Sequence, residues 1–538
     1  MKKLPLGIQN FKEIIEDNHV YVDKTMYIHR LISNGKSYFL SRPRRFGKSL
    51  LLDTIAEVFK GSKELFKGLW ISETDYDFMS YPVVKLDMSN ISCETPDVFK
   101  HTLSARVMDY IEEEGIRVSD ETPSGLLNNL IKGLHRKFNQ KVVMLIDEYD
   151  KPILDHITNI EIAEANRIIL SEFYGILKSL DSNIRFIFFT GVSKFTKTSV
   201  FSSLNNLSDI TMLEDYSNIC GIPVDDLHIV FGDRIKSLSE HKNFKHHPSL
   251  LDIILLWYDG YSWDGETKLL NPFGLLSFFH AKQTKSFWYV SGSPKFLIDL
   301  IKTKPECVFN FNNLIISETD LDAMDIQNLE VGSLLFQTGY LTVSKVIPAE
   351  PEIGVPPSYL LEIPNLEVRE AFFNQLTAGL TENEQIFTSG AFRQIRKALN
   401  AGDMQGILNV LKSLFSSIPY QLHVDSEAYY HSIFFSVMNV LGFKIDAEVS
   451  VSNGRIDATL ELVDKVYVFE FKYNKCPYDA DEEEKRKVLD KALELGMKQI
   501  TDRGYASKYT GSGKTVYLAV FAFLGRDNIE MLTKINPV

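Results

Sequence analysis

The stretch SYFLSRPRRFGKSLLLDTIAEVF, residues 37–59, carries the pattern that decides the fold of the first part of the chain. Its apolar start, residues 38–40, predicts a short strand, and a basic turn follows. Gly47-Lys48-Ser49 then opens a segment with apolar residues at helical spacing. Strand, loop and helix in this order direct free backbone amides and the positive end of a helix dipole toward one point. The stretch therefore predicts a phosphate-binding loop.

Each polar residue of this loop has an expected role. Lys48 would reach the β- and γ-phosphates of a nucleotide, and the Ser49 hydroxyl would hold Mg²⁺. Arg44 and Arg45 can contact phosphate directly or act across a subunit interface, and the sequence leaves both roles open. Arg42 stands where the usual motif has its first glycine, so the basic residues themselves must form the turn.

A second GKT sequence, TGSGKTVYLAV at residues 510–520, lacks this context. Lys508 occupies the position of the first glycine, and the residues after Thr515 form a continuous apolar run that predicts a strand instead of a helix. Without a helix N-terminus, the backbone amides do not converge on a phosphate. We therefore interpret residues 511–515 as a turn that leads into a strand.

Two further predicted strands end in polar residues that suit the same site. The stretch KVVMLIDEYDKPI, residues 141–153, predicts a buried strand that ends in Asp147 and Glu148. Asp147 would order Mg²⁺ through water, and Glu148 would polarise the attacking water. The apolar run 184–189 ends at Thr190, which we expect to contact the γ-phosphate.

Predicted strands alternate with amphipathic helices through the first 215 residues, and residues 82–86 supply one more strand. This alternation is typical of a doubly wound α/β domain that binds its ligand at the carboxyl ends of parallel strands. The expected ATP-binding set comprises Arg44, Arg45, Phe46, Gly47, Lys48, Ser49, Leu50, Asp147 and Thr190.

The composition limits the number of domains and the class of protein that the chain can form. A chain of 538 residues suggests about three or four domains, and 44% hydrophobic with 24% charged residues is ordinary for a soluble protein. No apolar run approaches the length that spans a bilayer, and the N-terminal residues lack the apolar core of a signal peptide. We expect a cytoplasmic protein that enters no membrane.

Cysteine usage and charge narrow the function classes further. The four cysteines never form a CxxC pair, so the sequence predicts neither a zinc site nor a disulfide framework. The formal net charge of −13 argues against a protein that coats nucleic acid with its whole surface. The net charge does not exclude a local basic groove that binds nucleic acid.

The middle of the chain predicts two smaller regions. Residues 216–330 are helical and aromatic and suggest a helical lid, in which Tyr258 and Tyr261 fit a core better than a ligand contact. Residues 331–420 predict a helix, a hairpin and a helix, as in a winged-helix-like module, followed by helices that lead to the last domain. The expected domains are 1–215, 216–330, 331–420 and 421–538.

Acidic residues gather again in the last region. Glu427 lies in the first turn of a predicted amphipathic helix, and Asp457 lies on a predicted strand. The next strand carries Glu470 and Lys472, which share one face because side chains alternate along a strand. An isolated pair of this kind is usually a solvated surface, but the four residues in this order favour a functional site.

This arrangement is one that metal-dependent phosphodiester cleavage requires. The two strand carboxylates and the carbonyl of Phe471 can hold Mg²⁺, or Mn²⁺ in its place, and Lys472 can orient the water or stabilise the transition state. The expected catalytic residues are Glu148, Asp457, Glu470 and Lys472. The expected metal ligands are Ser49, Asp147, Glu427, Asp457, Glu470 and Phe471.

Several motifs along the chain together resemble one family of bacterial proteins. They are YVDKT at residues 21–25, RPRRFGKSLLL, LIDEYD, TGVSKF, FSSLNNLSD, GYLTV, IPNLEV, GRID and FEFK. The chain resembles the predicted AAA-ATPase-like proteins that carry a C-terminal PD-(D/E)XK nuclease domain, and the likeness covers nearly the whole chain. RPRRFGKS is specific evidence, because the missing first glycine is itself the family pattern.

The resemblance implies a fold for both ends of the chain. We expect an α/β P-loop NTPase core of the AAA or STAND-like kind, with a helical lid and a winged-helix-like module. An α/β PD-(D/E)XK restriction-endonuclease-like domain follows.

Three functions remain open at this point. The first is an ATP-hydrolysing protein with a metal-dependent nuclease domain that acts on nucleic acid, DNA in preference to RNA, with defence against foreign nucleic acid as an analogy. The second is a nucleotide-dependent switch whose nuclease-like domain binds nucleic acid or a partner without cleaving it. The third is an assembly module whose ATP state controls the formation of a homo-oligomer.

Overall fold

A computed structural model of the chain describes most of its residues. They are 1–195, 200–201, 204, 206–288, 314–322, 330–372, 389–416, 427, 430, 433–435, 438, 443, 445–451, 454–475, 481–509, 511–525 and 528–536. The chain divides into two compact units, and each is described by itself. Unit 1 comprises Met1–Gly292 and Asn313–Glu367, and unit 2 comprises Ser293–Asn312 and Val368–Val538.

Unit 1 is built around a five-stranded sheet with the strand order β2-β3-β4-β1-β5, and all its paired strands are parallel. Its strands are β1 (Ser37–Ser41), β2 (Val83–Asp87), β3 (Val142–Asp147), β4 (Ile184–Gly191) and β5 (Ser208–Asp209). Every residue of β3 is buried, as expected for a parallel sheet that helices cover on both faces. The predicted doubly wound α/β core is confirmed.

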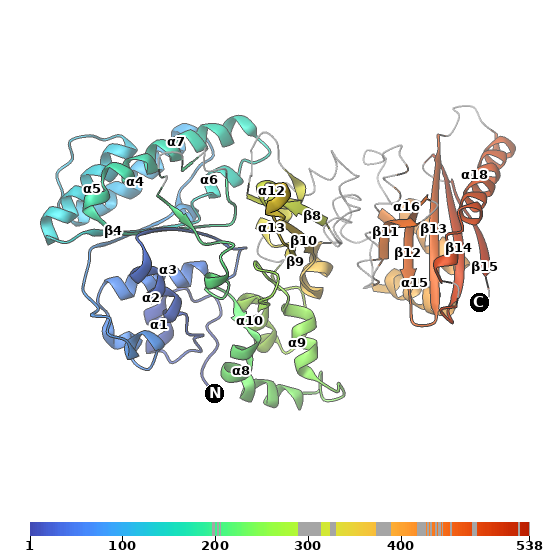
Figure 1. Ribbon diagram of the computed structural model, residues 1–538, viewed down its shortest axis with the longest axis horizontal. Coiled ribbons are helices and arrows are strands. Elements are labelled where there is room, and N and C mark those ends of the chain that lie inside the picture. The colour runs from blue at the N-terminus through green and yellow to red at the C-terminus, as the bar shows by residue number, and fades with distance from the viewer. Residues whose placement is uncertain are drawn as a thin grey trace. The chain divides into compact units, whose positions relative to one another are not determined.

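Helices cover both faces of this sheet (Figure 1). One layer contains α4 (Pro96–Glu113), α5 (Pro123–Phe138) and α7 (Ile160–Ser179), with the short α6 (Lys151–Leu154) nearby. The other layer contains α1 (Phe11–Glu16), α2 (Thr25–Asn34) and α3 (Lys48–Phe59). The helix α3 follows β1 in the chain, and the loop between them is the predicted phosphate-binding loop.

A helical region follows the parallel sheet. It contains α8 (Val224–Ser239), α9 (Leu250–Tyr258) and α10 (Pro272–Ala281), with the short paired strands β6 (Ile222–Pro223) and β7 (Leu269–Leu270). Tyr258 and Tyr261 are buried, as the sequence predicts for core residues. The assignment of this region as a lid stays a prediction.

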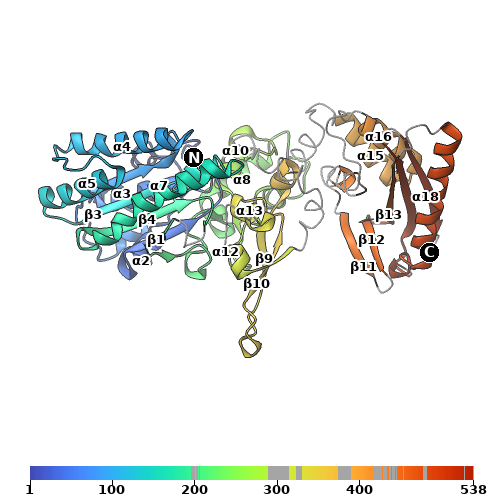
Figure 2. The same cartoon turned by 90° about the horizontal axis from the view of Figure 1, so that it is seen from above.

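The last part of unit 1 contains a small antiparallel sheet with the strand order β8-β10-β9. Its elements are β8 (Leu314–Ser317), α12 (Glu318–Asp322), α13 (Val331–Thr338), β9 (Thr342–Ile347) and β10 (Ser358–Glu362). The loop between β9 and β10 projects from the unit as a long finger (Figure 2). Helix, hairpin and a second helix at 366–372 match the predicted order, but β8 was not predicted. The winged-helix assignment stays a prediction.

Unit 2 contains a five-stranded mixed sheet with the strand order β11-β12-β13-β14-β15. The strands are β11 (Ile445–Val451), β12 (Gly454–Glu461), β13 (Lys465–Asn474), β14 (Thr515–Leu524) and β15 (Asn528–Asn536). β13 and β14 are parallel, and the other neighbours are antiparallel. The second GKT sequence ends at the start of β14, so the predicted turn into a strand is confirmed.

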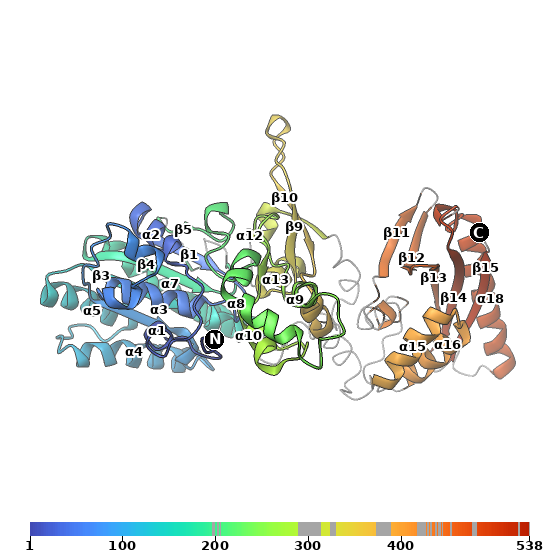
Figure 3. The ribbon, with the colours of Figure 1, turned by 90° about the horizontal axis from the view of Figure 1, so that it is seen from below.

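Helices lie on both faces of this sheet as well (Figure 3). They are α15 (Ser389–Ala401), α16 (Met404–Ser416) and α18 (Glu482–Asp502). Val466 and Val468 of β13 pack with α18 in one core, whereas the Tyr467 hydroxyl donates a hydrogen bond to the Leu399 carbonyl of α15 at 2.5 Å. Even-numbered residues of β13 therefore face α18, and odd-numbered residues face α15. No helix in the described ranges is long and apolar enough to cross a membrane.

Candidate functional sites

The loop between β1 and α3 has the geometry of a phosphate-binding loop. Gly47 precedes the helix with φ of 94°, a left-handed conformation that residues with a side chain avoid. Lys48 is only 5% exposed, and its Nζ donates hydrogen bonds to the Arg42 carbonyl at 2.8 Å and the Pro43 carbonyl at 2.9 Å. The lysine thus folds back over its own loop, which holds the ammonium at the helix N-terminus.

Arg42, which replaces the usual first glycine, is a structural residue. Its side chain is fully buried and donates hydrogen bonds to the carbonyls of Ser41 and Thr211, both at 2.9 Å. Its guanidinium also lies 3.9 Å from the centre of the Trp263 ring. Burial lowers the pKa of Arg42 to about 10, so the group stays charged at neutral pH. The arginine ties the loop to distant parts of unit 1, which a glycine could not do.

Asp147 and Thr190 meet at the ends of β3 and β4. The Thr190 hydroxyl donates a hydrogen bond to Asp147 Oδ1 at 2.5 Å, and both side chains are buried. The next residue, Glu148, has φ of 50°, which is uncommon for a residue with a side chain. This backbone turn directs Glu148 into the cleft described below, while Asp147 stays in the sheet.

Asp150 is a buried acid near this site that the sequence analysis did not select. Its carboxylate accepts hydrogen bonds from the backbone amides of Val192 at 3.0 Å and Ser193 at 2.5 Å. Burial raises the pKa of Asp150 to about 6. The residue therefore fixes the loop that follows β4. The second aspartate of LIDEYD was its only signal in the sequence.

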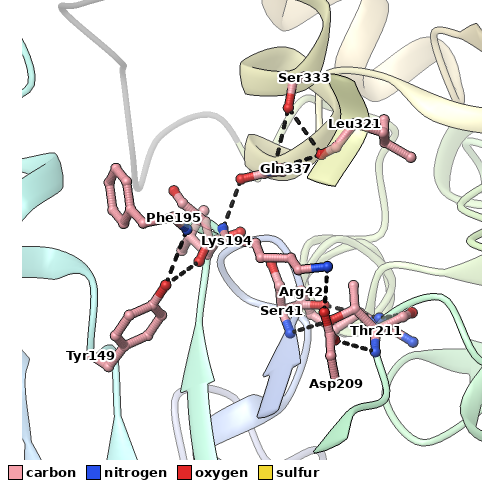
Figure 4. A network of polar contacts seen from close by, with 12 residues as sticks. Ser41, Arg42, Tyr149, Lys194, Phe195, Asp209, Thr211, Leu321, Ser333 and Gln337 are labelled. Atoms are coloured by element: carbon pink, nitrogen blue, oxygen red, sulfur yellow. Dashed lines mark hydrogen bonds and ion pairs between the residues drawn. The ribbon is translucent and has the colours of Figure 1, made fainter. Parts of the chain in front are cut away.

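The loop after β4 is also tied to the small sheet region of unit 1 (Figure 4). The Lys194 amide donates a hydrogen bond to Gln337 Oε1 at 2.8 Å, and Gln337 Nε2 donates to the Leu321 carbonyl at 3.0 Å. The Lys194 ammonium pairs with Asp209 of β5 at 2.5 Å. This network joins the end of β4, beside Asp147, to α12 and α13.

A cleft of about 440 Å³ opens beside the phosphate-binding loop. Seven residues of the expected nucleotide set line it together with Glu148: Arg44, Arg45, Phe46, Gly47, Lys48, Ser49 and Leu50. Asp147 and Thr190 are not in its wall. The rest of its wall is formed by residues 5–9, Lys151, Asp155, Pro272, Phe273 and Leu276. Residues 5–9 were not expected from the sequence. The Arg45 guanidinium lies 5.0 Å from the centre of the Phe273 ring.

The charged side chains around this cleft influence one another's pKa values. Burial lowers the pKa of Lys48, and the charges of Asp147, Glu148 and Asp150 oppose that shift. Burial also raises the pKa of Glu148, which the charges of Lys48 and Arg44 oppose. The side chain of Phe46 is fully buried against Tyr261 and Trp263, so only its backbone can face a phosphate.

A second, smaller pocket of about 100 Å³ adjoins the phosphate-binding loop. It shares Pro5, Phe46, Gly47, Leu50, Pro272 and Leu276 with the cleft. The rest of its wall is largely apolar and includes residues 20–22 and 219–222. A polar cleft with an apolar side pocket suits a ligand that has both a charged and a flat apolar part.

In unit 2 the predicted acids of the two neighbouring strands come together. Asp457 Oδ2 accepts a hydrogen bond from the Phe471 amide at 2.8 Å, across β12 and β13. Lys472 Nζ donates a hydrogen bond to Glu470 Oε1 at 2.7 Å. Asp457, Glu470 and Lys472 thus form one cluster, which confirms the predicted shared face of Glu470 and Lys472.

Glu470 is the most unusual member of this cluster. It has no exposed surface, and its Oε2 atom has no hydrogen-bond partner among the described residues. Burial, and next the negative charge of Asp457, raise the pKa of Glu470 to about 7. Burial alone would lower the pKa of Lys472, but its hydrogen bond to Glu470 and the nearby acids raise it. A buried carboxylate oxygen without a donor is suited to a cation.

The residues present fit a divalent cation with two carboxylates and a carbonyl. In the described part of the chain, no three His, Cys, Asp or Glu side chains converge closely enough to hold a metal. Glu427 is exposed, and its Oε2 accepts a hydrogen bond from the Tyr473 amide at 3.2 Å. Asp457, Glu470 and the Phe471 carbonyl are the members of the predicted ligand set on β12 and β13, and the charge of Glu427 acts on both Glu470 and Lys472. The ligand role of Glu427 stays a prediction.

A glycine brings α18 close to this cluster. A Cβ atom on Gly496 would lie 2.5 Å from Val520 Cγ1 and 3.5 Å from Lys472 Cγ. The helix can therefore pack tightly over β13 and β14 only with glycine here. Gln499, one turn further on, is half-buried. The predicted helix that carries Glu427 is described at only a few positions.

These two sites define the class of the protein. Unit 1 has a parallel α/β sheet with strand, loop and helix in the order of a P-loop domain, and unit 2 has a mixed sheet with Asp457 and Glu470 on neighbouring strands. Residues 5–201 match the family described as Predicted AAA-ATPase, and residues 425–531 match the PD-(D/E)XK nuclease superfamily.

A full-length relative supports the same assignment. The chain is 35% identical over 524 residues to the "Uncharacterized protein in vnfD 5'region" of Azotobacter chroococcum mcd 1. The match covers 96% of this chain and 95% of the relative. The chain belongs to the family of predicted AAA-ATPases that carry a C-terminal PD-(D/E)XK nuclease superfamily domain.

Proposed function

We propose that unit 1 binds and hydrolyses ATP together with Mg²⁺. Lys48, Ser49 and Glu148 line the cleft beside Gly47. Lys48 and Ser49 would hold the phosphates and their cation, and Glu148 would polarise the attacking water. Arg44 and Arg45 add positive charge to the same cleft. The apolar side pocket receives the base, because it adjoins the loop and offers apolar walls to a flat ring.

We further propose that unit 2 cleaves nucleic acid, with DNA as its substrate. The observation that carries this proposal is the buried Glu470 carboxylate, whose Oε2 atom has no hydrogen-bond partner in the described residues. Asp457, Glu470 and the carbonyl of Phe471 would hold a divalent cation here. Such a cation, when bound, supplies an activated water and neutralises charge on a phosphodiester.

Lys472 has a separate role in this proposal. Its ammonium already donates a hydrogen bond to Glu470 Oε1, so it lies beside the cation site. From there it orients the attacking water or stabilises the charge that develops on the phosphate. Asp457 Oδ2 accepts a hydrogen bond from the Phe471 amide, which holds this carboxylate near Glu470. A role in defence against foreign nucleic acid stays an analogy.

A direct experiment separates this proposal from a non-cleaving switch or an assembly module. The purified full chain is incubated with linear, circular and single-stranded DNA and with RNA, in Mg²⁺ or Mn²⁺, with and without ATP. Cleavage of DNA that needs the cation supports the proposal. A stable complex with uncleaved DNA would favour the switch, and an ATP-dependent change in molecular size without cleavage would favour the assembly module.

The nucleotide half of the proposal is tested by a matched pair of lysines. Lys48→Ala should lose most of the affinity for ATP, because it removes a charged phosphate contact. Lys514→Ala is the control, since Lys514 lies in the second GKT sequence and pairs with Glu461 at 2.5 Å. Equal loss of ATP binding in both variants would contradict the choice of loop.

A further inference from the structure

The YVDKT motif at residues 21–25 contains a lysine that the proposed function leaves without a role. The residues on either side of this lysine have structural roles. Asp23 accepts hydrogen bonds from the Thr25 amide at 2.8 Å and the Trp70 amide at 2.7 Å. Thr25 in turn accepts one from the Ile71 amide at 3.0 Å. These contacts fix the start of α2, and they place Lys24 between two anchored residues.

Lys24 lies in the wall of the apolar side pocket of unit 1. Its side chain is only 11% exposed. Among the residues that line the pocket, all of them in the described part of the chain, Lys24 is the one with a charged side chain. The same wall contains Gly47 and Leu50, which also border the phosphate cleft. Lys24 therefore places a positive charge beside the phosphate-binding loop, in the pocket that is proposed to receive the base.

The ammonium of Lys24 has one charged partner among the ion pairs of the described residues. Its charged partner there is Asp226, at 3.8 Å, a distance too long for a hydrogen bond. The hydroxyl of Thr54, in the same wall, already donates to the Leu50 carbonyl at 2.8 Å. Burial lowers the pKa of Lys24, and the charge of Asp226 opposes that shift. An ammonium carries three donors, so Lys24 can donate to a ligand in the pocket as well as pair with Asp226.

We propose that Lys24 donates a hydrogen bond to an acceptor atom of the purine ring of the bound nucleotide. This inference rests on the proposed nucleotide site, and it adds the residue that recognises the base. The apolar wall packs against the faces of the ring, and the ammonium selects a ring with an acceptor at its edge. Lys24 is therefore a specificity-determining residue, separate from Lys48, which binds the phosphates.

The test compares ligands that differ by one ring atom. Calorimetric titration of the full chain with Mg²⁺ measures the affinities for ATP, 1-deaza-ATP, 3-deaza-ATP, 7-deaza-ATP and inorganic tripolyphosphate. Each deaza analogue replaces one acceptor nitrogen by a C–H group. In the wild-type protein, one analogue should bind about 10- to 100-fold more weakly than ATP, the range for a hydrogen bond to a charged donor.

The variant Lys24→Met should bind ATP about 10- to 100-fold more weakly and should no longer distinguish that analogue from ATP. Tripolyphosphate should bind the variant and the wild type equally, which also shows that the variant is folded. Lys12→Met is the matched control, because Lys12 is exposed and pairs only at 3.8 Å with Glu16. It should leave all affinities unchanged.

Two outcomes would overturn the inference alone. One is a wild-type protein that binds ATP and every deaza analogue with equal affinity. The other is a Lys24→Met protein that binds ATP within about twofold of the wild type, well below the loss expected for a charged hydrogen bond. A wild-type protein that binds neither ATP nor tripolyphosphate would overturn the proposed nucleotide site as well.

Discussion

Thr190 Oγ1 donates a hydrogen bond to Asp147 Oδ1 at 2.5 Å, between the ends of two neighbouring strands. The sequence led us to expect that Thr190 contacts the γ-phosphate, and that contact stays a prediction. The structure adds a second role, because the hydroxyl fixes the orientation of the acid that is expected to order Mg²⁺. The two residues act as one unit at the edge of the sheet.

Thr190→Val should therefore slow ATP hydrolysis more than it weakens ATP binding. Loss of a hydrogen bond to a carboxylate corresponds to about a 10- to 100-fold effect, and steady-state hydrolysis with a parallel binding titration measures both quantities. Thr190→Ser should restore the rate. Ser37→Ala is a matched control, since the buried Ser37 hydroxyl has no hydrogen-bond partner in the described residues. Unchanged hydrolysis in Thr190→Val would contradict the role in orienting Asp147.

Arg42→Met should lower the stability of unit 1. The substitution removes one donor each from the Ser41 and Thr211 carbonyls and removes the cation from the Trp263 ring. The expected cost is about 2–4 kcal/mol, read by scanning calorimetry as a lower unfolding temperature. Arg44→Met is the control, because Arg44 is exposed. If both variants unfold at the same temperature, Arg42 has no structural role of the kind described.

Affinity for the divalent cation in unit 2 should rise with pH. Burial and the charge of Asp457 raise the pKa of Glu470 to about 7, so the carboxyl holds a proton below that pH and must lose it to bind a cation. Mn²⁺ affinity, measured without nucleotide, should rise about tenfold per pH unit below 7 and level off above it. Glu470→Gln should bind weakly at every pH. Wild-type affinity that is flat from pH 6 to 8 would be the contrary result.

The phosphate-binding loop could be predicted from the sequence because its signal is local. Strand, basic turn, glycine, lysine and helix occur within residues 37–59, and the structure reproduces that order. The role of Arg42 could not be predicted, since its partners Thr211 and Trp263 are distant in the chain. The N-terminal wall of the cleft, residues 5–9, was missed for the same reason: nothing local marks a segment that folds back over a site.

In the nuclease-like site, too, local features could be predicted from the sequence, whereas contacts between distant segments could not. Alternation along β13 was sufficient to place Glu470 and Lys472 on one face, and the strand order of β12 and β13 brought Asp457 to them. The helix α18 approaches Lys472 and Val520 closely through Gly496. That approach has no signature in the strand sequence. The metal-binding role of Glu427 stays a prediction.

Lys472→Ala should keep cation binding but lose rate. Removal of one charge-stabilising donor typically lowers kcat by a factor of about 100 to 1,000, so a sensitive assay should still detect activity. Lys475→Ala is a close control, because Lys475 lies just beyond the end of β13 and is exposed. A Lys472→Ala protein that cleaves at the wild-type rate would remove the lysine from the mechanism.

The central claim is that Asp457 and Glu470 form the cleavage site of unit 2. The most direct measurement compares DNA cleavage by the wild type and by the double variant Asp457→Ala, Glu470→Ala, with ATP binding followed in parallel. We predict cation-dependent cleavage by the wild type and none by the double variant, with equal ATP affinity in both. Cleavage that survives in the double variant would contradict the claim, as would a folded, cation-loaded wild type that cleaves no DNA or RNA with or without ATP.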